Sequence, residues 1–486
     1  MRRVLLFLAM AVTALAVVAQ AAAFTPADPL AAKQWYLQDD HAFDAWAVPP
    51  TTLAPVKVAI VDSGVDCSLP DFQGRIAATR SFVGGDPCVD TDGHGTFVAG
   101  IIAANLDSQG IVGIAYTSQL LIAKVVRSSD GQIPLEAEAA AIRWAADSGA
   151  RVINLSLGGV RDPVDLNRDT FSSREASAIA YAYARGAVLV AAVGNGDEAP
   201  AEPWPFADYP AALPHVMGVS ALTHSGNVAD FSDRDAVFND LSAPGEGIFS
   251  TFPLALTAQR PLCTDQGFSD CGPPADYTNA EGTSFAAPQV SATAAVLLAL
   301  NPLLTNDQVS TIIEHSADDV NAASGCSKCP PLRDAYSGWG RVDVAKAVAA
   351  LAAGPLPVPD KFETNDDAGT QAHTLWGKKY GLTATLDYWD DPVDVYRVAL
   401  GPHERLTAKV NGGWAGAQVK LTLWKPGTRA VELPSQAGLR AAQSASPGAR
   451  QHVTFTARSR GWYYVEVKVV TPGFGPYTLS LVKTTK

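Results

Sequence analysis

Between residues 55 and 350 the sequence alternates short runs of β-branched apolar residues with longer alanine-rich runs. An alternation of this kind is typical of a parallel sheet whose strands are connected by helices. The apolar runs are nearly continuous, which indicates strands that are buried on both faces. The sequence therefore predicts an α/β domain that contains a mostly parallel sheet with helices on both faces.

Five runs are predicted to be strands and three to be helices. The strands are expected at 56–61, 120–126, 151–155, 187–193 and 216–222. The helices are expected at 135–148, 172–185 and 284–300. Open sheets of this class carry their functional groups in loops beyond the carboxyl ends of the strands, so a site is sought there.

A second domain is predicted after the alternation stops. Residues 351–360 contain three prolines and are predicted to form a semi-rigid linker. Strand-like runs separated by turn residues follow at 393–400, 418–424, 452–457, 462–470 and 477–482. We therefore expect an α/β domain at 24–350 and a small, antiparallel, sandwich-like all-β domain at 361–486.

Residues 1–23 have the layout of a signal peptide. Two arginines precede an apolar run at 4–18, and small residues follow up to Ala23. The alternative, a membrane anchor, fits less well because a span needs about 20 apolar residues. We expect a secreted chain, extracellular or, in a Gram-negative source, periplasmic, with no membrane contact after cleavage.

Six cysteines in an exported chain predict disulfides. Their spacing suggests the pairs Cys67 with Cys88, Cys263 with Cys271, and Cys326 with Cys329, although other connectivities stay open. The last pair could also be a redox motif or half of a metal site, but no second such pair occurs.

The formal net charge is -13. A surface of this sign repels nucleic acid and anionic membranes, so we expect neither as a partner. We further expect a monomer.

Three short blocks carry residues that suit nucleophilic catalysis. Asp62 follows directly on the strand at 56–61, His94 lies between Gly93 and Gly95, and Ser284 opens the helix at 284–300. Each has an ordinary explanation when taken alone: a turn aspartate, a surface histidine and a helix N-cap serine. Their occurrence together in one α/β domain favours chemistry.

In their sequence and order, the blocks around Asp62, His94 and Ser284 resemble the signatures of the subtilisin-like serine proteases, over roughly residues 28–350. The resemblance implies that Ser284 attacks the scissile carbonyl, that His94 moves the proton and that Asp62 orients the imidazole. It also implies that Asn195, which follows the strand at 187–193, stabilises the oxyanion. A secreted serine endopeptidase that acts on extended or unfolded proteins and peptides is the expected function.

The same resemblance implies further binding residues. Ser156, Leu157 and Gly158 match the family's substrate-binding strand, although a core strand followed by a turn explains them equally well. A structural Ca²⁺ is the expected cofactor, and the chemistry itself needs none. Its ligands are expected to be Asp28, Asp71, Asn105, Asp107, Gln109 and Ile111, although scattered acids are usually ordinary surface residues.

Departures from the family pattern are also present. Phe97 and Phe285 replace the usual histidine and methionine, and neither is expected to touch the triad. Residues 28–46 already resemble a mature N-terminus, so no separate pro-domain is expected. The segments at 360–366, 394–396 and 475–479 resemble the bacterial pre-peptidase C-terminal domain.

Other functions remain as alternatives. A silent binding protein would have lost a triad residue, and an ester hydrolase of the α/β-hydrolase type would carry a Gly-x-Ser-x-Gly elbow; neither feature occurs. An adhesin whose main activity lies in the C-terminal domain is the third alternative. Side-chain specificity is not determined by these motifs.

Overall fold

The computed structural model describes residues 24–485, except for a set of internal segments. These are 48–52, 198, 254, 257–267, 271–276, 354–360, 363–364, 370, 389–390, 415, 430, 432–433 and 472. The predicted signal peptide, the predicted Cys263 to Cys271 disulfide and most of the predicted linker therefore lie outside the described residues.

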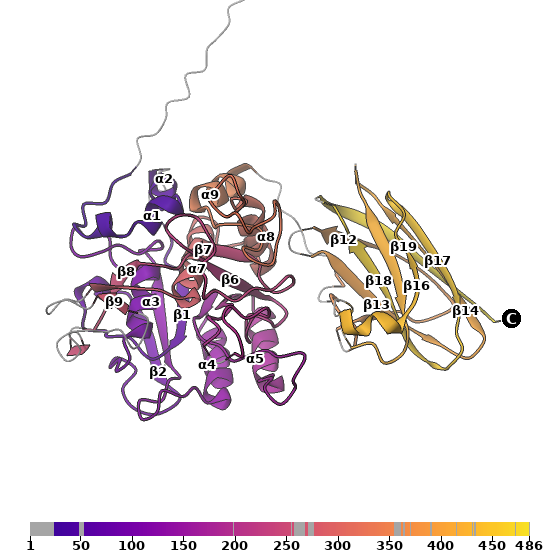
Figure 1. Ribbon diagram of the computed structural model, residues 1–486, viewed down its shortest axis with the longest axis horizontal. Coiled ribbons are helices and arrows are strands. Elements are labelled where there is room, and N and C mark those ends of the chain that lie inside the picture. The colour runs from indigo at the N-terminus through magenta and orange to yellow at the C-terminus, as the bar shows by residue number, and fades with distance from the viewer. Residues whose placement is uncertain are drawn as a thin grey trace, which may run out of the picture.

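Seven parallel strands form the central sheet of the first domain, in the order β2-β3-β1-β4-β5-β6-β7 (Figure 1). Their bounds are β1 (Lys57–Asp62), β2 (Ile76–Ser81), β3 (Gln119–Lys124), β4 (Val152–Leu155), β5 (Val188–Ala192), β6 (Val216–Leu222) and β7 (Leu241–Pro244). This sheet confirms the predicted α/β class.

Helices cover both faces of this sheet. On one face, α3 (His94–Ala103) and α7 (Thr283–Leu300) pack in one apolar core with the sheet. On the other face, α4 (Leu135–Asp147) and α5 (Ser173–Tyr183) pack in a second core. Almost every residue of α7 is buried, as expected for a helix that is apolar on all sides.

Shorter elements complete the first domain. The helices are η1 (Ala31–Lys33), α1 (Tyr36–Asp39), α2 (Ala42–Ala47), η2 (Pro70–Phe72), α8 (Asn306–Ser316) and α9 (Val344–Ala353). A small antiparallel sheet contains β8 (Ile248–Thr251), β10 (Tyr277–Ala280) and β9 (Phe268–Asp270). Helix α9 extends three residues into the segment that was predicted to be a linker.

The second domain is a sandwich of two sheets around one apolar core (Figure 1). One sheet has the order β11-β13-β18-β15-β16 and the other β12-β19-β14-β17. The strands are β11 (His373–Thr374), β12 (Lys379–Asp387), β13 (Val393–Leu400), β14 (Glu404–Gly412), β15 (Val419–Trp424), β16 (Arg440–Ser444), β17 (Arg450–Thr456), β18 (Gly461–Val469) and β19 (Phe474–Thr485), with a 3₁₀ helix η3 (Pro434–Leu439). The all-β expectation is confirmed, although β11, β12, β14 and β16 were not predicted.

The two domains meet at the start of the sandwich. His315 on α8 hydrogen-bonds the Asp387 carboxylate at the end of β12, 3.0 Å away. The ring of Tyr388 packs edge-on against Trp339, with the ring centroids 5.1 Å apart. A polar contact and an aromatic contact therefore join them.

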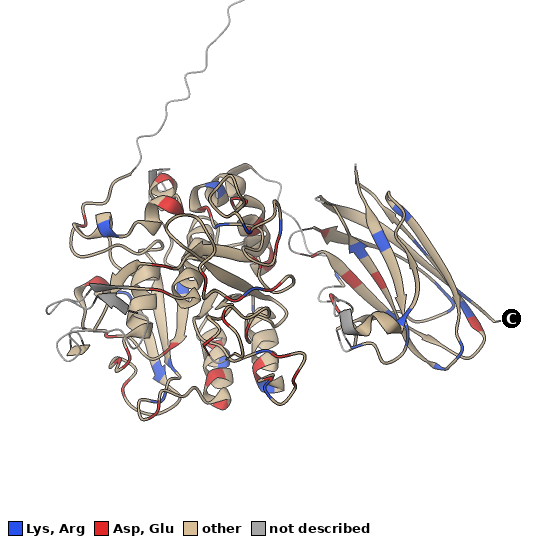
Figure 2. Cartoon of the chain, viewed as in Figure 1, with Lys and Arg blue, Asp and Glu red and all other residues tan. Residues whose placement is uncertain are grey.

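Charge is divided unequally between the two domains. Residues 361–486 contain 16 Lys and Arg against 10 Asp and Glu, so the acidic excess belongs to the preceding residues. Blue segments, which mark the positions of Lys and Arg, accordingly occur along the strands of the sandwich in Figure 2. The net negative charge that disfavours polyanion partners therefore belongs to the α/β domain and not to the sandwich.

Two of the predicted disulfides are present. Cys67 is bonded to Cys88, and Cys326 to Cys329. The second bond supports a structural role for the Cys-x-x-Cys sequence.

One described helix, α7, is long and apolar enough to cross a membrane by length and composition. Its residues are, however, mostly buried in the α/β core.

Candidate active site

Asp62 and His94 are brought together at the carboxyl end of the central sheet. Asp62 is the last residue of β1 and is 2% exposed, and His94 is the first residue of α3. The imidazole Nδ1 lies 2.9 Å from Asp62 Oδ1 and 3.0 Å from Oδ2. An aspartate that holds Nδ1 in this way leaves Nε2 as the nitrogen available for proton transfer.

A second aspartate, Asp90, organises the loop that carries His94. Its Oδ1 accepts hydrogen bonds from the Ser63 hydroxyl and the Gly93 N–H, both 2.9 Å away. Its Oδ2 accepts from the Thr96 N–H at 2.9 Å and from the Thr96 hydroxyl at 2.6 Å. Asp90 therefore ties the end of β1 to the first turn of α3.

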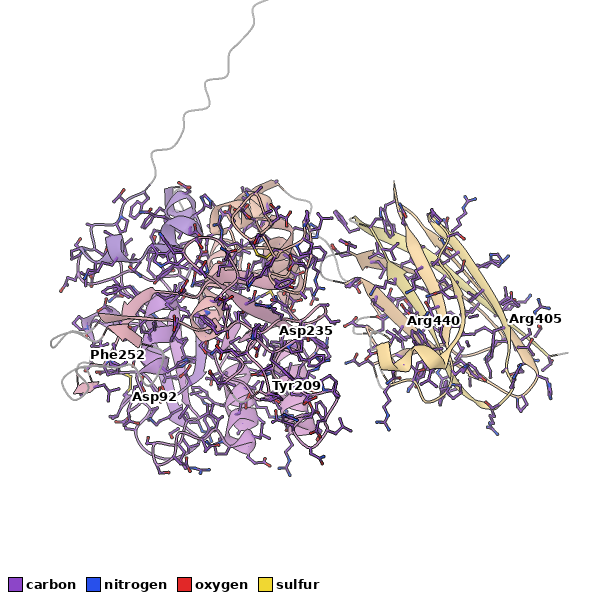
Figure 3. All side chains as sticks on the ribbon, viewed as in Figure 1. Asp92, Tyr209, Asp235, Phe252, Arg405 and Arg440 are labelled. Atoms are coloured by element: carbon purple, nitrogen blue, oxygen red, sulfur yellow. A yellow bond between two sulfur atoms is a disulfide. The ribbon has the colours of Figure 1, made fainter. Side chains whose placement is uncertain are left out.

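Sequence reasoning missed Asp90 and Ser63. Asp90 lies only four residues before His94, but nothing in the Asp-Thr-Asp-Gly-His run distinguishes it from its neighbour Asp92. The difference is burial, because Asp90 is 5% exposed whereas Asp92 is only partly buried. Asp92 is labelled in Figure 3.

Close contact with neighbouring backbone explains why residue 95 is a glycine. A Cβ atom on this residue would lie 2.1 Å from the carbonyl oxygen of Gly64 and 3.1 Å from Asp62 Oδ1. Any side chain here would therefore push α3 away from β1 and separate the imidazole from its carboxylate.

The pKa of His94 reflects two opposing effects. Burial lowers the pKa, because a charged imidazole loses solvation. The charge and hydrogen bond of Asp62, with smaller contributions from Asp92 and Asp90, outweigh burial and raise the pKa to about 9. The resting imidazole is therefore a strong base that must lose a proton before it can accept one.

Ser284 is the second residue of α7, and a network of hydrogen bonds fixes it against the end of β4. The Ser156 hydroxyl donates to the backbone carbonyl of Ser284 at 2.7 Å, and the Ser284 hydroxyl donates to the Ser156 carbonyl at 3.3 Å. Asn154 donates to the Ser156 hydroxyl at 2.9 Å. Ser156 is 4% exposed, so its side chain positions Ser284 instead of facing a ligand.

Phe285 corrects one expectation. Its ring centroid lies 5.4 Å from that of His94 and 4.6 Å from that of Phe97. Phe285 therefore packs beside the imidazole, contrary to the prediction that neither phenylalanine touches the triad. This contact limits the positions that the imidazole can adopt.

Asn195 lies beyond the end of β5 (Val188–Ala192), and its amide is oriented by Thr283. The Asn195 Oδ1 accepts from the Thr283 N–H at 2.9 Å and from the Thr283 hydroxyl at 2.8 Å. Since these bonds occupy the amide oxygen, the Nδ2 group faces the other way, and no described residue accepts a hydrogen bond from it. Together with the Ser284 N–H, which has no partner within its helix, Nδ2 can donate to an oxyanion.

A pocket of about 190 Å³ opens beside these groups. Ser284 and Asn195 form part of its lining, together with Leu157 and Gly158, whereas His94 does not. Tyr209 N–H donates to the Gly159 carbonyl and Gly159 N–H to the Tyr209 carbonyl, both at 2.9 Å, which closes one wall. Tyr209 is labelled in Figure 3.

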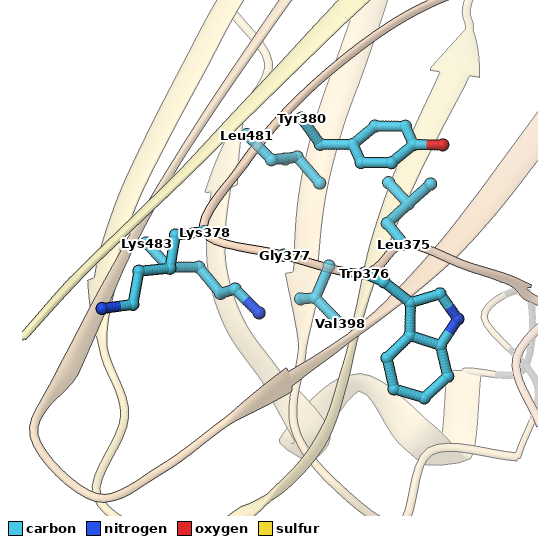
Figure 4. A pocket seen from close by; sticks show the side chains of 8 residues that line it. All are labelled: Leu375, Trp376, Gly377, Lys378, Tyr380, Val398, Leu481 and Lys483. Carbon is cyan, nitrogen blue, oxygen red and sulfur yellow. The ribbon is translucent and has the colours of Figure 1, made fainter.

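A second hollow lies in the sandwich, beside Trp376, Lys378 and Lys483 (Figure 4). Its volume of about 10 Å³ is close to that of a single water. Among the described residues its lining includes no acid and no imidazole, and it has no room for a ligand larger than water, so we assign it no chemistry.

Part of the expected calcium set comes together. Asp28 Oδ1 accepts from the N–H groups of Asp107 at 3.0 Å and Ser108 at 3.1 Å, and Asp71 Oδ1 accepts from the Ile111 N–H at 3.4 Å. The second Asp28 oxygen is buried and accepts no hydrogen bond from the described residues. A buried carboxylate oxygen of this kind fits a cation.

The other expected ligands fit less well. The Asn105 side-chain oxygen accepts from Arg75 Nε at 2.5 Å, so it is already occupied by a cationic group. The side chains of Asp107 and Gln109 are exposed.

A cluster of His41, Asp318 and Asp343 also offers ligand atoms that lie within 4.8 Å of one another. Lys346 and Arg341 form ion pairs with Asp318, and Lys346 with Asp343. Two cationic side chains already neutralise these acids, so the cluster is explained as an ion-pair network.

Comparison with known proteins gives concordant matches. The profile of the subtilase family matches residues 54–340. Thermitase from Thermoactinomyces vulgaris is 32% identical over 329 residues, which cover 67% of this chain and 99% of thermitase. Subtilisin DY from Bacillus licheniformis is 33% identical over 268 residues, which cover 55% of this chain and 85% of that protein.

A solved structure described as proteases from Pseudoalteromonas arctica is also similar. Its sequence is 25% identical to this chain and its TM-score is 0.53. The match covers 67% of this chain and 99% of the other chain. The family match ends at residue 340, so it does not include the sandwich domain.

Proposed function

Because this chain belongs to the subtilase family and is a serine-type endopeptidase, we propose that Asp62, His94 and Ser284 are its catalytic triad. The observation that carries this proposal is the pair of short contacts between the buried Asp62 carboxylate and His94 Nδ1. Protein or peptide substrates follow from the family.

In the proposed mechanism, the neutral imidazole of His94 accepts the hydroxyl proton of Ser284 as its Oγ attacks the scissile carbonyl carbon. The resulting imidazolium donates that proton to the leaving amine, and an acyl-enzyme remains. Water then repeats the sequence and releases the acid. In the resting chain the Ser284 hydroxyl donates to Ser156, so it must rotate toward His94 when substrate binds.

We further propose that Asn195 Nδ2 and the Ser284 N–H form the oxyanion hole. The orientation of the amide by Thr283 supports this role, because a preorganised donor needs no rearrangement when charge develops. The extended peptide would run along Leu157 and Gly158, with its side chains entering the adjacent pocket.

Secretion and domain organisation are proposed on the sequence pattern. Residues 1–23 would direct export, the α/β domain would carry the protease, and the sandwich would be an accessory domain of the pre-peptidase C-terminal type.

A structural Ca²⁺ is proposed at Asp28, Asp71 and the backbone carbonyls of 105–111, which supply oxygen ligands. The bound ion would link the N-terminal segment that carries Asp28 to the loop at 105–111. Calcium should raise the melting temperature of the wild type but not that of Asp28→Asn. Equal shifts in the two proteins would exclude Asp28 as a ligand.

The test of the proposed function is cleavage of unfolded casein by the mature chain and by Ser284→Ala. The substitution should reduce kcat by about 10⁶-fold, a magnitude obtained within the subtilases themselves. A sulfonyl fluoride should label Ser284 in the wild type. Cleavage that persists in the Ser284→Ala protein would overturn the assignment.

A further inference from the structure

The pocket beside Ser284 has an acidic lining. Of the described residues that line it, two are acids, Asp197 and Asp208, and none is lysine, arginine or histidine. Asp208 is half-buried, whereas Asp197 is exposed. The pocket therefore presents negative charge both inside and at its solvent edge.

Asp208 lies between Gly158 and Gly194, which form two glycine walls of the pocket. A Cβ atom on Gly158 would lie 3.2 Å from Asp208 Cβ and 3.5 Å from its Oδ2, and one on Gly194 would lie 2.6 Å from the same oxygen. The Asp208 N–H donates to the Val193 carbonyl at 2.8 Å. The carboxylate is therefore held at a defined position between backbones that carry no side chains.

A third carboxyl group, Asp233, lies behind the Gly194 wall. Its Oδ2 would be 2.5 Å from a Cβ on Gly194, and the Gly196 N–H donates to it at 3.1 Å. Asp233 is completely buried. It thus places a third carboxyl group against this wall without lining the pocket.

One buried cation follows the pocket residue Val160 in the sequence, and this cation is already paired. Arg161 forms an ion pair with Asp235 at 2.8 Å, and both side chains are buried. Arg161 does not line the pocket. Its charge is therefore balanced by Asp235.

The position of the pocket determines which substrate residue enters it. The lining includes Ser284, which attacks the scissile carbonyl, and Asn195, which would hold its oxygen, but not His94, which serves the leaving amine. The residue that bears this carbonyl has its Cα one bond from the attacked carbon. Its side chain is therefore the one that reaches the pocket.

We propose that Asp208, assisted by Asp197, makes this enzyme select lysine or arginine as the residue on the acyl side of the scissile bond. The aliphatic stem of such a side chain fits between Leu157 and the glycine walls, and its charged end reaches the Asp208 carboxylate. This inference rests on the proposed function, since it takes Ser284 as the nucleophile.

The test uses peptides that differ only in the acyl-side residue: arginine, lysine, norleucine or glutamate. We expect kcat/KM for arginine and lysine to exceed that for norleucine by at least about tenfold, the factor that corresponds to the lower end of measured coupling between close charges. Glutamate should be the poorest substrate. Rates are divided by the concentration of active sites that a sulfonyl fluoride labels, so that unfolded protein is excluded from the enzyme concentration.

Asp208→Asn should reduce the ratio of arginine to norleucine to near one, and Asp197→Asn should reduce it less. Because each ratio is measured within one protein, a general loss of activity cancels. The matched control is Asp230→Asn, which removes one negative charge at an exposed ion pair with Lys328 and should keep the wild-type ratio. Asp197→Asn, at an exposed residue, serves as the second variant if Asp208→Asn does not fold.

The outcomes separate the two proposals. Labelled enzyme that cleaves norleucine as well as arginine would overturn the basic selectivity and leave the proposed function intact. A ratio that Asp208→Asn does not change would overturn the role of Asp208. Failure to label Ser284 or to cleave any of the peptides would overturn both proposals.

Discussion

The two sides of Ser284, the proposed nucleophile, both contain aspartates, but the aspartates are held differently. On the imidazole side, Asp62 and Asp90 accept hydrogen bonds from His94 and from the loop that carries it. On the pocket side, Asp208 and Asp197 line a cavity that a ligand can enter. The comparison teaches that an aspartate bonded to the imidazole orients that group, whereas an aspartate that lines a cavity is placed to meet a ligand.

Among the aspartates, the largest expected effect comes from the imidazole side. Asp62→Asn should lower kcat by about 10⁴-fold, because an amide at this position favours the wrong imidazole tautomer. The matched control is Asp92→Asn, which removes a nearby charge that raises the pKa of His94 without a bond to the imidazole. If the two variants lost equal activity, charge and not geometry would be the contribution of Asp62.

The dependence of kcat/KM on pH should also reflect the imidazole side of the site. Because the pKa of His94 is raised to about 9, the imidazole is protonated at neutral pH and becomes a base only as pH increases. The kcat/KM for a norleucine peptide should therefore rise with pH, by about tenfold per unit well below pH 9, and then level off. A plateau that begins below pH 7 would contradict the role of Asp62 in raising this pKa.

A smaller effect is expected from the buried acid behind the pocket. Burial, then the charges of Asp208 and Asp197, raises the pKa of Asp233 to about 8 despite hydrogen bonds from the Trp204 and Gly196 N–H groups. Asp233 is therefore neutral below this pH and adds a third negative charge above it.

The ratio of arginine to norleucine should accordingly rise a few-fold between about pH 7 and 9. The titration of His94 affects both substrates and cancels in the ratio. In Asp233→Asn the ratio should stay constant, so an equal rise in that variant would show that another group is responsible.

The same ionisation affects stability. The folded-state pKa of Asp233 lies above its unfolded value, so the unfolded chain binds fewer protons between about pH 4 and 8. The free energy of unfolding should therefore fall as pH rises through this range, and the fall should be smaller in Asp233→Asn. Thermal unfolding at several pH values measures the difference.

Much of the fold was predictable because it depends on local pattern. The strand at 216–222 was predicted with the bounds that the structure shows, and the other predicted strands of the central sheet differ by one or two residues at an end. In the sandwich, β14 was missed although Leu406, Ala408 and Val410 alternate with polar residues, a pattern typical of a half-buried strand. Its burial is decided by pairing with β17 and β19, which are distant in sequence.

The sequence by itself determined the α/β class, and it led to the proposed triad of Asp62, His94 and Ser284 because each lies in a short block that resembles a family signature. In the block around His94, a side chain on Gly95 would collide with Gly64 and Asp62. Only the tertiary structure decided the acidic pocket. Asp208 and the glycines at 158 and 194 meet because the ends of parallel strands converge at one edge of the sheet, and no local pattern encodes that convergence.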